Sequence, residues 1–286
     1  WIERSTNTIN DVIEGLTLNL KTLGSTNVNV SNNNESIKEQ VRTFVEKTNE
    51  VLSQFKKSME YDERTDEGSL LTGNYGTQIV QSKIKSILSS KGIGFSYDND
   101  NFPSLSTIGI KTDHNEGSKT YGQLLLDETA LDEALQKDAR GVAELFGADY
   151  IGESESSNLS YHSHVSGITK GGTYNVTYSI DGATEKITSA FINGHEASIE
   201  GELIIGKSGY SESGLAIRVS DLTTTATNAT GTVNLKQGKA DEFAKALSEL
   251  SNSSSGPLSI IEDNYTDIVD NINQKISDEH ARISRM

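Results

Sequence analysis

The feature that most constrains this chain is an apolar stripe that begins after Asn34 and runs to about Thr65. Apolar side chains recur there at heptad-like steps of four and three residues, which places them on one narrow face of a long helix. Such a face is typical of coiled coils and long helical bundles, and it requires a partner helix to cover it. The stripe consists of Ile37, Val41, Phe44, Val51 and Phe55.

A second stripe with a similar spacing lies at the other end of the chain, within residues 257–286. We therefore expect these two helices to pack together as one rod. A shorter helix is predicted over residues 75–89, where glycines at 92 and 94 close it. The second stripe consists of Ile261, Tyr265, Ile268, Ile272, Ile276 and Ile283.

The middle of the chain differs in composition and in period. Residues 147–172 are rich in Ser and Gly, and we expect a linker or a loosely held strand there. Apolar and polar residues then alternate, and the pairs 181–182 (Asp-Gly) and 193–194 (Asn-Gly) have the composition of tight hairpin turns. This pattern predicts about five or six antiparallel strands, followed by a helix over residues 239–250.

Together these patterns predict an α+β multidomain protein, in which a helical-bundle or coiled-coil-like domain with small β elements carries an inserted antiparallel β-domain. The expected boundaries are 1–150 for the first part of the helical core, 151–256 for the β-rich insert and 257–286 for the returning helix. Because both ends of the insert feed the same helical domain, we expect them to lie close together. Near the N-terminus, residues 16–20 are predicted to pair with residues 28–30 as a small hairpin.

Composition limits the functions that the chain can perform. It carries 41 acidic and 25 basic side chains, for a formal charge of -16, so the phosphates of nucleic acid and acidic membrane surfaces would be repelled. The sequence contains no cysteine, which excludes disulfides and thiolate chemistry. No apolar run approaches the roughly 20 residues that span a bilayer, so membrane insertion is not expected.

Few side chains indicate catalysis or metal binding. His162 and His164 could share one strand face and bind a divalent metal, but no cysteine and no suitably spaced carboxylate accompanies them. Asp98, Asp100 and Asn101 form an acidic loop that lacks the glycine and the glutamate of a calcium-binding EF-hand. The sequence also lacks a nucleophile elbow and a phosphate-binding loop. We therefore expect no catalytic, cofactor or metal site.

Three segments resemble a known family. Residues 104–146 contain the pattern Leu-x-x-Ile-Gly-Ile, a turn, Gly-x-Leu-x-Leu-Asp, and a Leu-rich helix that ends in Leu-Phe. Residues 7–20 (NTINDVIEGLTLNL) and 68–88 (GSLLTGNYGTQIVQSKIKSIL) carry the same resemblance. All three are similar to the flagellar filament cap proteins, the FliD family of flagellar hook-associated protein 2. The resemblance covers residues 1–150 and, more weakly, 258–286, as in a fragment without the family's terminal coiled-coil tails.

This resemblance implies a structural, non-enzymatic subunit of the cap at the distal tip of the bacterial flagellar filament. Such a subunit would self-associate into a ring and would promote flagellin assembly and filament elongation. Its partners would be flagellin and further copies of the chain, with a host surface as another candidate. The resemblance also implies export through the flagellar secretion apparatus and an extracellular location. The two apolar stripes are then candidates for contacts between neighbouring subunits as well as for packing within one.

A second function stays open for the β-rich insert, which could act as an extracellular adhesin or a glycan-binding module. Aromatic rings that lie exposed on a β surface can stack on sugars. The candidate residues are Tyr161, Tyr174, Tyr178 and Tyr210.

Overall fold

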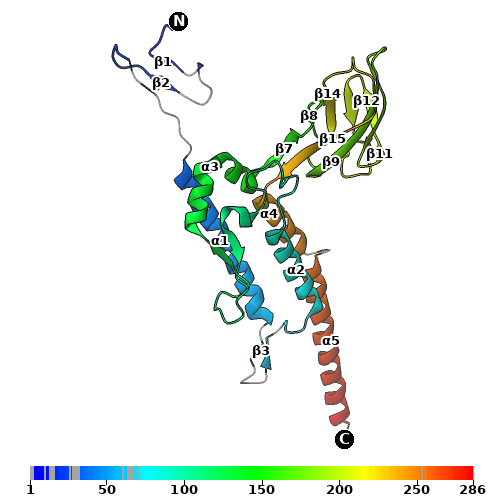
Figure 1. Cartoon of the computed structure of the whole chain (residues 1–286). Helices are drawn as coiled ribbons and strands as arrows, with labels where there is room; N and C mark the ends of the chain where they lie inside the picture. The colour runs from blue at the N-terminus through cyan, green and yellow to red at the C-terminus, as the bar shows by residue number, and fades with distance from the viewer. Residues whose placement is uncertain are drawn as a thin grey trace. The chain divides into compact units, whose positions relative to one another are not determined.

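The computed structural model describes residues 3–285 except for 10, 13–16, 26, 28–32, 60, 63–66, 70, 253 and 255. Its contacts divide the chain into two units, Trp1–Asn33 and Asn34–Met286. The described residues form helices and antiparallel sheets (Figure 1), which confirms the predicted α+β multidomain class.

The N-terminal unit contains a short two-stranded ribbon. Strand β1 (Thr8–Ile9) pairs antiparallel with β2 (Leu18–Asn19), and Ile9 lies opposite Leu18. Strand β2 thus has β1 as one partner, whereas residues 28–30, with which residues 16–20 are predicted to pair, lie outside the described part. An alternating pattern identifies a strand, but it fits a partner on either side equally well.

Four helices of the second unit share one apolar core. They are α1 (Asn34–Met59), α2 (Tyr75–Ser89), α3 (Glu128–Gly147) and α4 (Lys239–Leu250). The segments that connect them contain β3 (Tyr61–Asp62), β4 (Glu67–Gly68), the 3-10 helix η1 (Leu105–Ile108), β5 (Ile110–Thr112) and β6 (Leu124–Leu126). In this set β3 pairs with β4 and β5 pairs with β6, both antiparallel.

Side-chain caps fix the starts of α2 and α3. The Asn74 side chain accepts a hydrogen bond from the Thr77 backbone N–H at 3.1 Å. Asp127 accepts from the N–H groups of Thr129 and Ala130 at 3.0 and 3.1 Å. These bonds satisfy backbone donors that have no partner within the helix, so the capping residues determine where each helix begins.

Helix α3 is interrupted at Asp138, whose backbone has non-helical angles (φ -160°, ψ 82°). The Asp138 carboxylate accepts a hydrogen bond from the Gly141 backbone N–H at 2.8 Å, as an N-cap does. The segment is thus two helices in tandem, and the second one has its own cap.

The β-rich part consists of two antiparallel sheets whose inner faces share a second apolar core. One sheet has the strand order β11-β10-β9-β15-β7 and the other the order β12-β13-β14-β8. The strands are β7 (Asp149–Ser154), β8 (Leu159–Ser163), β9 (Gly172–Asp181), β10 (Lys186–Ile192), β11 (His195–Glu196), β12 (Ser198–Glu200), β13 (Leu203–Ile205), β14 (Ala216–Val219) and β15 (Ala226–Gln237).

Local sequence explains much of this part. In β9, Tyr174, Val176, Tyr178 and Ile180 are buried and alternate with more exposed residues, as the predicted pattern requires. Asn193 and Gly194 both have positive φ (49° and 82°), which is the geometry of a type I′ turn. Residues 147–172, expected as a linker or a loosely held strand, instead contribute the paired strands β7 and β8.

The two ends of the β-rich part leave the helical core side by side. Asp149, at the start of β7, lies opposite Gln237, at the end of β15. The backbone N–H of Gln237 also donates to the Ile93 carbonyl at 2.9 Å, which attaches β15 to the segment after α2. The expected closeness of the two ends is therefore observed.

Helix α4 belongs structurally to the helical core, although the expected boundary of 151–256 includes it in the insert. Its buried residues Phe243, Ala246 and Leu250 lie in the helical core. At its start, the buried Lys239 ammonium donates to the Ile87 carbonyl at 2.7 Å and pairs with Glu242 at 2.9 Å. The lysine therefore satisfies a free carbonyl at the C-terminal end of α2.

The terminal helix α5 (Pro257–Ile283) packs against α2 rather than along α1, and Figure 1 shows α5 continuing past α2 to the C-terminus. Gly76 of α2 leaves room for Ile261, because a Cβ at position 76 would lie 2.9 Å from Ile261 Cδ1. The expectation that residues 261–283 would pack on residues 37–55 within one chain is wrong. The apolar face of α1 is already covered by α3, by β6 and, at Phe44, by Phe243 of α4, so it is not free for α5.

Candidate interaction surfaces

The predicted stripe on α1 is used mainly inside the chain. Val41 is 2% exposed, and the other four residues of the stripe are half-buried against the helical core. The Phe44 ring lies edge-on to Phe146 of α3 and Phe243 of α4, with centroid distances of 5.2 and 6.0 Å. The half-buried residues are Ile37, Phe44, Val51 and Phe55.

A small apolar groove remains beside this stripe, with a volume of ≈ 220 Å³. Ile37 and Phe44 line it from α1, and Phe146 lines it from α3. Charged groups also connect α1 with the start of α3, where Arg42 forms two hydrogen bonds with Glu128 at 2.8 and 2.9 Å. The Arg42 guanidinium lowers the pKa of the Glu128 carboxyl below its usual value.

The second predicted stripe, on α5, is exposed. From Thr266 to Arg285 every side chain is exposed, and Ile268, Ile272 and Ile276 are 46%, 51% and 50% exposed. Ile261 and Tyr265 are half-buried at the end that lies on α2. A row of exposed isoleucines on one helix leaves a large apolar surface in contact with water. Such surfaces mark interaction sites.

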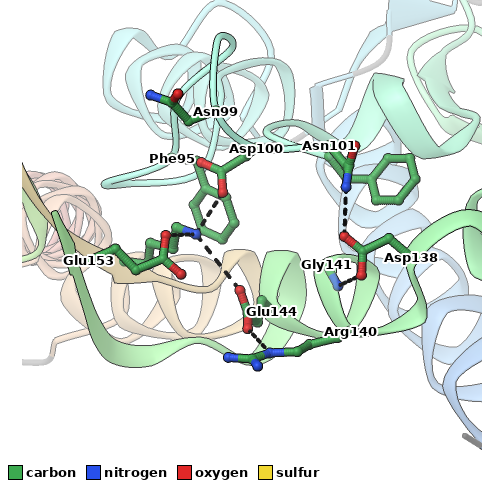
Figure 2. A pocket seen from close by; sticks show the side chains of 11 residues that line it. Phe95, Asn99, Asp100, Asn101, Asp138, Arg140, Gly141, Glu144 and Glu153 are labelled. Carbon is green, nitrogen blue, oxygen red and sulfur yellow. Dashed lines mark hydrogen bonds and ion pairs between the residues drawn. The ribbon is translucent and has the colours of Figure 1, made fainter. Parts of the chain in front are cut away.

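A buried ionic cluster lies where the β-rich part joins the helical core. Lys236 of β15 has a side chain that is only 3% exposed, and its ammonium lies 2.6 Å from Asp100, 2.6 Å from Glu153 and 3.8 Å from Glu144. Figure 2 shows these three carboxylates converging from the loop after α2, from β7 and from α3. Through Lys236, the cluster thus connects strands β7 and β15 of the β-rich part with the loop after α2 and with α3.

The charge of Lys236 is stabilised by its neighbours. Burial alone lowers its pKa, but the hydrogen bonds with Asp100 and Glu153 outweigh this effect, so the pKa lies above the usual value. The ammonium also lies 5.2 Å from the centroid of the Phe95 ring, as in a cation–π contact. A lysine that is held in its charged form among carboxylates is suited to fixing the two parts in one orientation.

The open side of this cluster is a polar pocket of ≈ 310 Å³. On its rim Asn101 donates to Asp138 at 2.9 Å, and the hydrogen bonds from Gly141 and Asn101 lower the Asp138 pKa. Asp100 and Asn101, which with Asp98 were weighed as calcium ligands, are therefore engaged with protein groups. Among the described residues no cluster of three His, Cys, Asp or Glu side chains could hold a metal ion.

The tyrosines considered for glycan stacking do not form a shared platform. Tyr174 and Tyr178 are 2% and 4% exposed, and burial raises the pKa of Tyr174 to about 12. The Tyr161 hydroxyl lies 2.7 Å from His164 Nδ1. Tyr210 is exposed, but its ring stacks on His195 at a centroid distance of 3.7 Å.

The paired histidines also have separate environments. His164 stacks on Tyr150 with a centroid distance of 5.3 Å, whereas His162 Nδ1 lies 3.4 Å from an Arg218 guanidinium nitrogen. The two imidazoles therefore have different partners. Their spacing of two residues in the sequence does not indicate a shared metal site.

Sequence reasoning missed Lys236, because its contacts come from three segments far apart in the chain. One local signal exists: the run Val233–Gln237 is buried on both strand faces, so the polar residues in it require partners. In the part of the chain that the structure describes, no helix has both the length and the apolar character needed to cross a membrane.

Comparison with known proteins gives a consistent result. The family model described as "Flagellar hook-associated protein 2 C-terminus" matches residues 1–286. Curated proteins named flagellar hook-associated protein 2 are similar to the chain: that of Salmonella typhimurium is 26% identical over 155 residues, that of Helicobacter pylori strain J99 is 27% identical over 154 residues, and that of Escherichia coli K12 is 28% identical over 161 residues.

Each of these alignments covers 52% of the chain but only 31%, 21% and 32%, respectively, of the relative. The chain thus matches about a third or less of the length of each curated relative. No solved structure matches the chain.

Proposed function

The chain belongs to the flagellar hook-associated protein 2 family, and from this premise we propose that it is a structural subunit of the cap at the distal tip of the bacterial flagellar filament. In this role the subunit promotes flagellin assembly and thereby filament elongation. The observation that carries the proposal is the family match over residues 1–286. The family consists of structural flagellar proteins, and we propose no catalytic activity for this member.

The architecture supports a role in assembly. Four helices share one apolar core, and the Lys236 cluster connects the β-rich part to them. We propose that copies of the chain associate through exposed faces of the helical core, including the half-buried edge of α1 and the exposed stripe of α5. A ring requires that two different faces of each subunit meet, so at least one further face of the core must take part.

The proposed partners are flagellin and other copies of the chain. The outer faces of the β-rich part, which the helical core does not cover, would meet flagellin or a host surface. Because a filament cap works outside the cell, we further propose export by the flagellar secretion apparatus. None of these roles needs a cofactor.

Deletion of the gene in its source bacterium tests the proposal, with filaments counted by electron microscopy and flagellin measured in the medium. We expect the deletion strain to have few or short filaments and to release flagellin, and the full-length gene to restore filaments. Normal filaments in the deletion strain would contradict the proposal.

A second strain separates the two parts of the chain. It carries the full-length protein with residues 150–236 replaced by a short Gly-Ser link, which the adjacency of Asp149 and Gln237 permits. We expect this strain to retain more filaments than the deletion strain, because the helical core is left to assemble. If its filament count equalled that of the deletion strain while the protein was present and folded, the β-rich part would be the essential one.

A further inference from the structure

A pocket of ≈ 150 Å³ lies within the helical core, between α1, α2 and the turn before β6. Leu52 and Lys56 line it from α1, and because they are one helical turn apart they share a face of that helix. Gln81 and Lys85 line it from α2 with the same spacing. The sequence thus places one lysine on each of two walls of the same pocket.

The third wall is the turn of residues 121–123. Gly122 has a φ of +81°, which glycine adopts readily, and its N–H donates to the Asp113 carbonyl at 2.8 Å. The Gln123 side chain donates to Ser53 Oγ at 2.7 Å, which attaches the turn to α1. A Cβ at position 122 would meet no atom within 4 Å, so the turn leaves open space beside it.

The pocket is positively charged, although the chain has a formal charge of -16. Among the described residues that line it, two are lysines and none is Asp or Glu, whereas four carboxylates line the pocket beside Lys236. Helix α2 itself contains Lys83 and Lys85 but no acidic residue. Lys83 pairs with Glu249 of α4 at 3.0 Å, so α4 neutralises only one of these two lysines.

The two lysines of the pocket are free to meet an external anion. Lys56 and Lys85 are exposed, and in the described part of the chain neither ammonium takes part in a hydrogen bond or an ion pair. Asp113, in the loop that leads to the turn, is 8% exposed and accepts hydrogen bonds from Asn115 and Thr120 at 2.9 and 2.7 Å. Its carboxylate is therefore engaged by its own loop.

The lining suits the carboxylate of an acidic side chain better than a small free anion. Leu52 and the Tyr121 ring give the pocket apolar walls, against which the methylene groups of Asp or Glu can pack. A carboxylate has two oxygens, so it can accept a hydrogen bond from each lysine. Each exposed ion pair strengthens binding by no more than about fivefold, so two such pairs hold a free anion only weakly. A carboxylate that belongs to a larger partner gains further affinity from the contacts around it.

We propose that this pocket is a docking site for an acidic side chain of a partner protein, with the carboxylate between the ammonium groups of Lys56 and Lys85. The segment that docks carries one Asp or Glu between apolar residues. A segment with a basic residue at this place would be repelled, so the pocket selects its partner by charge. The site lies in the helical core alone and does not depend on the role in the filament cap.

Chemical-shift titration of the isotopically labelled full chain by NMR tests the proposal. The probe is the peptide acetyl-Ala-Leu-Glu-Leu-Ala-amide, and the same peptide with Gln in place of Glu is the neutral control. The backbone amide signals of residues 81–85 and 121–123 should shift saturably with the Glu peptide. Because it can form two ion pairs, this peptide should bind roughly tenfold more tightly than the Gln peptide. The difference should shrink as sodium chloride is added, since salt screens exposed charges.

Two double variants show whether the effect belongs to this pocket. Lys56→Gln with Lys85→Gln should lower the affinity for the Glu peptide roughly tenfold, to that of the Gln peptide. The matched control is Lys57→Gln with Lys111→Gln, which removes the same charge from exposed lysines that do not line the pocket, and it should change the affinity less than twofold. All four lysines are exposed, so circular dichroism should show an unchanged fold.

Three results would overturn the proposal. The first is equal affinity for the Glu and Gln peptides, or no saturable shift with either. The second is an equal loss in the two double variants, because the effect would then reflect net charge alone. The third comes from sodium phosphate at the same ionic strength: if the signals of residues 81–85 and 121–123 respond to phosphate at lower concentrations than to the Glu peptide, the pocket binds a free anion instead of a protein side chain.

Discussion

Replacement of Lys236 by Met tests whether the buried cluster holds the β-rich part on the helical core. Methionine has a similar length and can keep the contact with the Phe95 ring, so the change removes the charge without opening a large cavity. It leaves Asp100 and Glu144, whose side chains are each 14% exposed, without their cation. Loss of one partner from a buried ion pair typically costs about 3–5 kcal/mol.

The expected cost lies near the lower end of this range. Glu153 is 44% exposed, so water can solvate it once the ammonium is gone. Glu144 keeps a hydrogen bond from Arg140 at 2.6 Å, and Asp100 keeps one from the Ser96 N–H at 2.7 Å. We therefore expect Lys236→Met to lower the free energy of unfolding by about 3 kcal/mol, which shifts a urea midpoint by roughly 1 M.

Urea unfolding monitored by circular dichroism measures this effect, and hydrogen exchange shows where it acts. Exchange should become faster in residues 95–102 and in β7, which meet at the cluster. Lys186→Met, at an exposed position of β10, is the matched control and should change stability by no more than about 0.5 kcal/mol. Asp100→Asn in the Lys236→Met background removes one unpaired charge and should recover about 1 kcal/mol or more.

Two results would refute this reasoning. The first is a Lys236→Met protein whose urea midpoint equals that of the wild type, which would mean that the pairing energy only offsets the cost of desolvation. The second is strict additivity of Lys236→Met and Asp100→Asn, because residues that share a buried ion pair must show a coupling energy.

Two further changes test other local features. Asp138→Ala removes the cap in the middle of α3 and should cost about 1 kcal/mol at neutral pH. Since the hydrogen bond from Gly141 holds the Asp138 pKa below 3.8, this stabilisation is present above that pH and is lost as the pH falls through the folded-state pKa, so thermal unfolding of the two proteins should converge in acid. Gly94→Ala should cost about 3 kcal/mol, because φ is +76° and the new Cβ would lie 2.4 Å from the Leu235 carbonyl oxygen. Gly122→Ala, at φ +81° with open space around it, should cost only about 1 kcal/mol in the same urea assay, and equal costs would show that the close approach of Leu235 is unimportant.

Periodicity predicted the helices well but not their partners. The steps of four and three placed α1 correctly and identified Val41 as buried, because a repeat near 3.6 residues can only align on a helix. It could not show that Phe44 would meet Phe146 and Phe243, since those residues lie about 100 and 200 positions further along the chain. Any apolar face could have covered α1, and the long segment with the most similar spacing was α5.

In the β-rich part, too, the sequence pattern predicted some elements and missed others. Strict alternation identified β9, where Tyr174 and Val176 are buried, but β7 and β8 were expected as linker or loosely held strand. Leu159 is the one fully buried residue of β8, so the strand carries almost no apolar signal and depends on its neighbour β14 for order. Short polar strands form because they pair with a neighbouring strand, and the local sequence pattern does not show that neighbour.

The Lys236 cluster follows from topology rather than from any motif. The β-rich part begins at Asp149 and ends at Gln237, and because these two residues lie opposite each other, the insertion adds little strain to the core that carries it. Adjacent ends alone would act as a hinge, since two neighbouring strands can bend together. The buried ammonium of Lys236 opposes this motion, because a rotation of the β-rich part would separate it from Asp100, and both groups are largely shielded from water. The buried ion cluster thus favours one orientation of the β-rich part, as the proposed role in assembly would require.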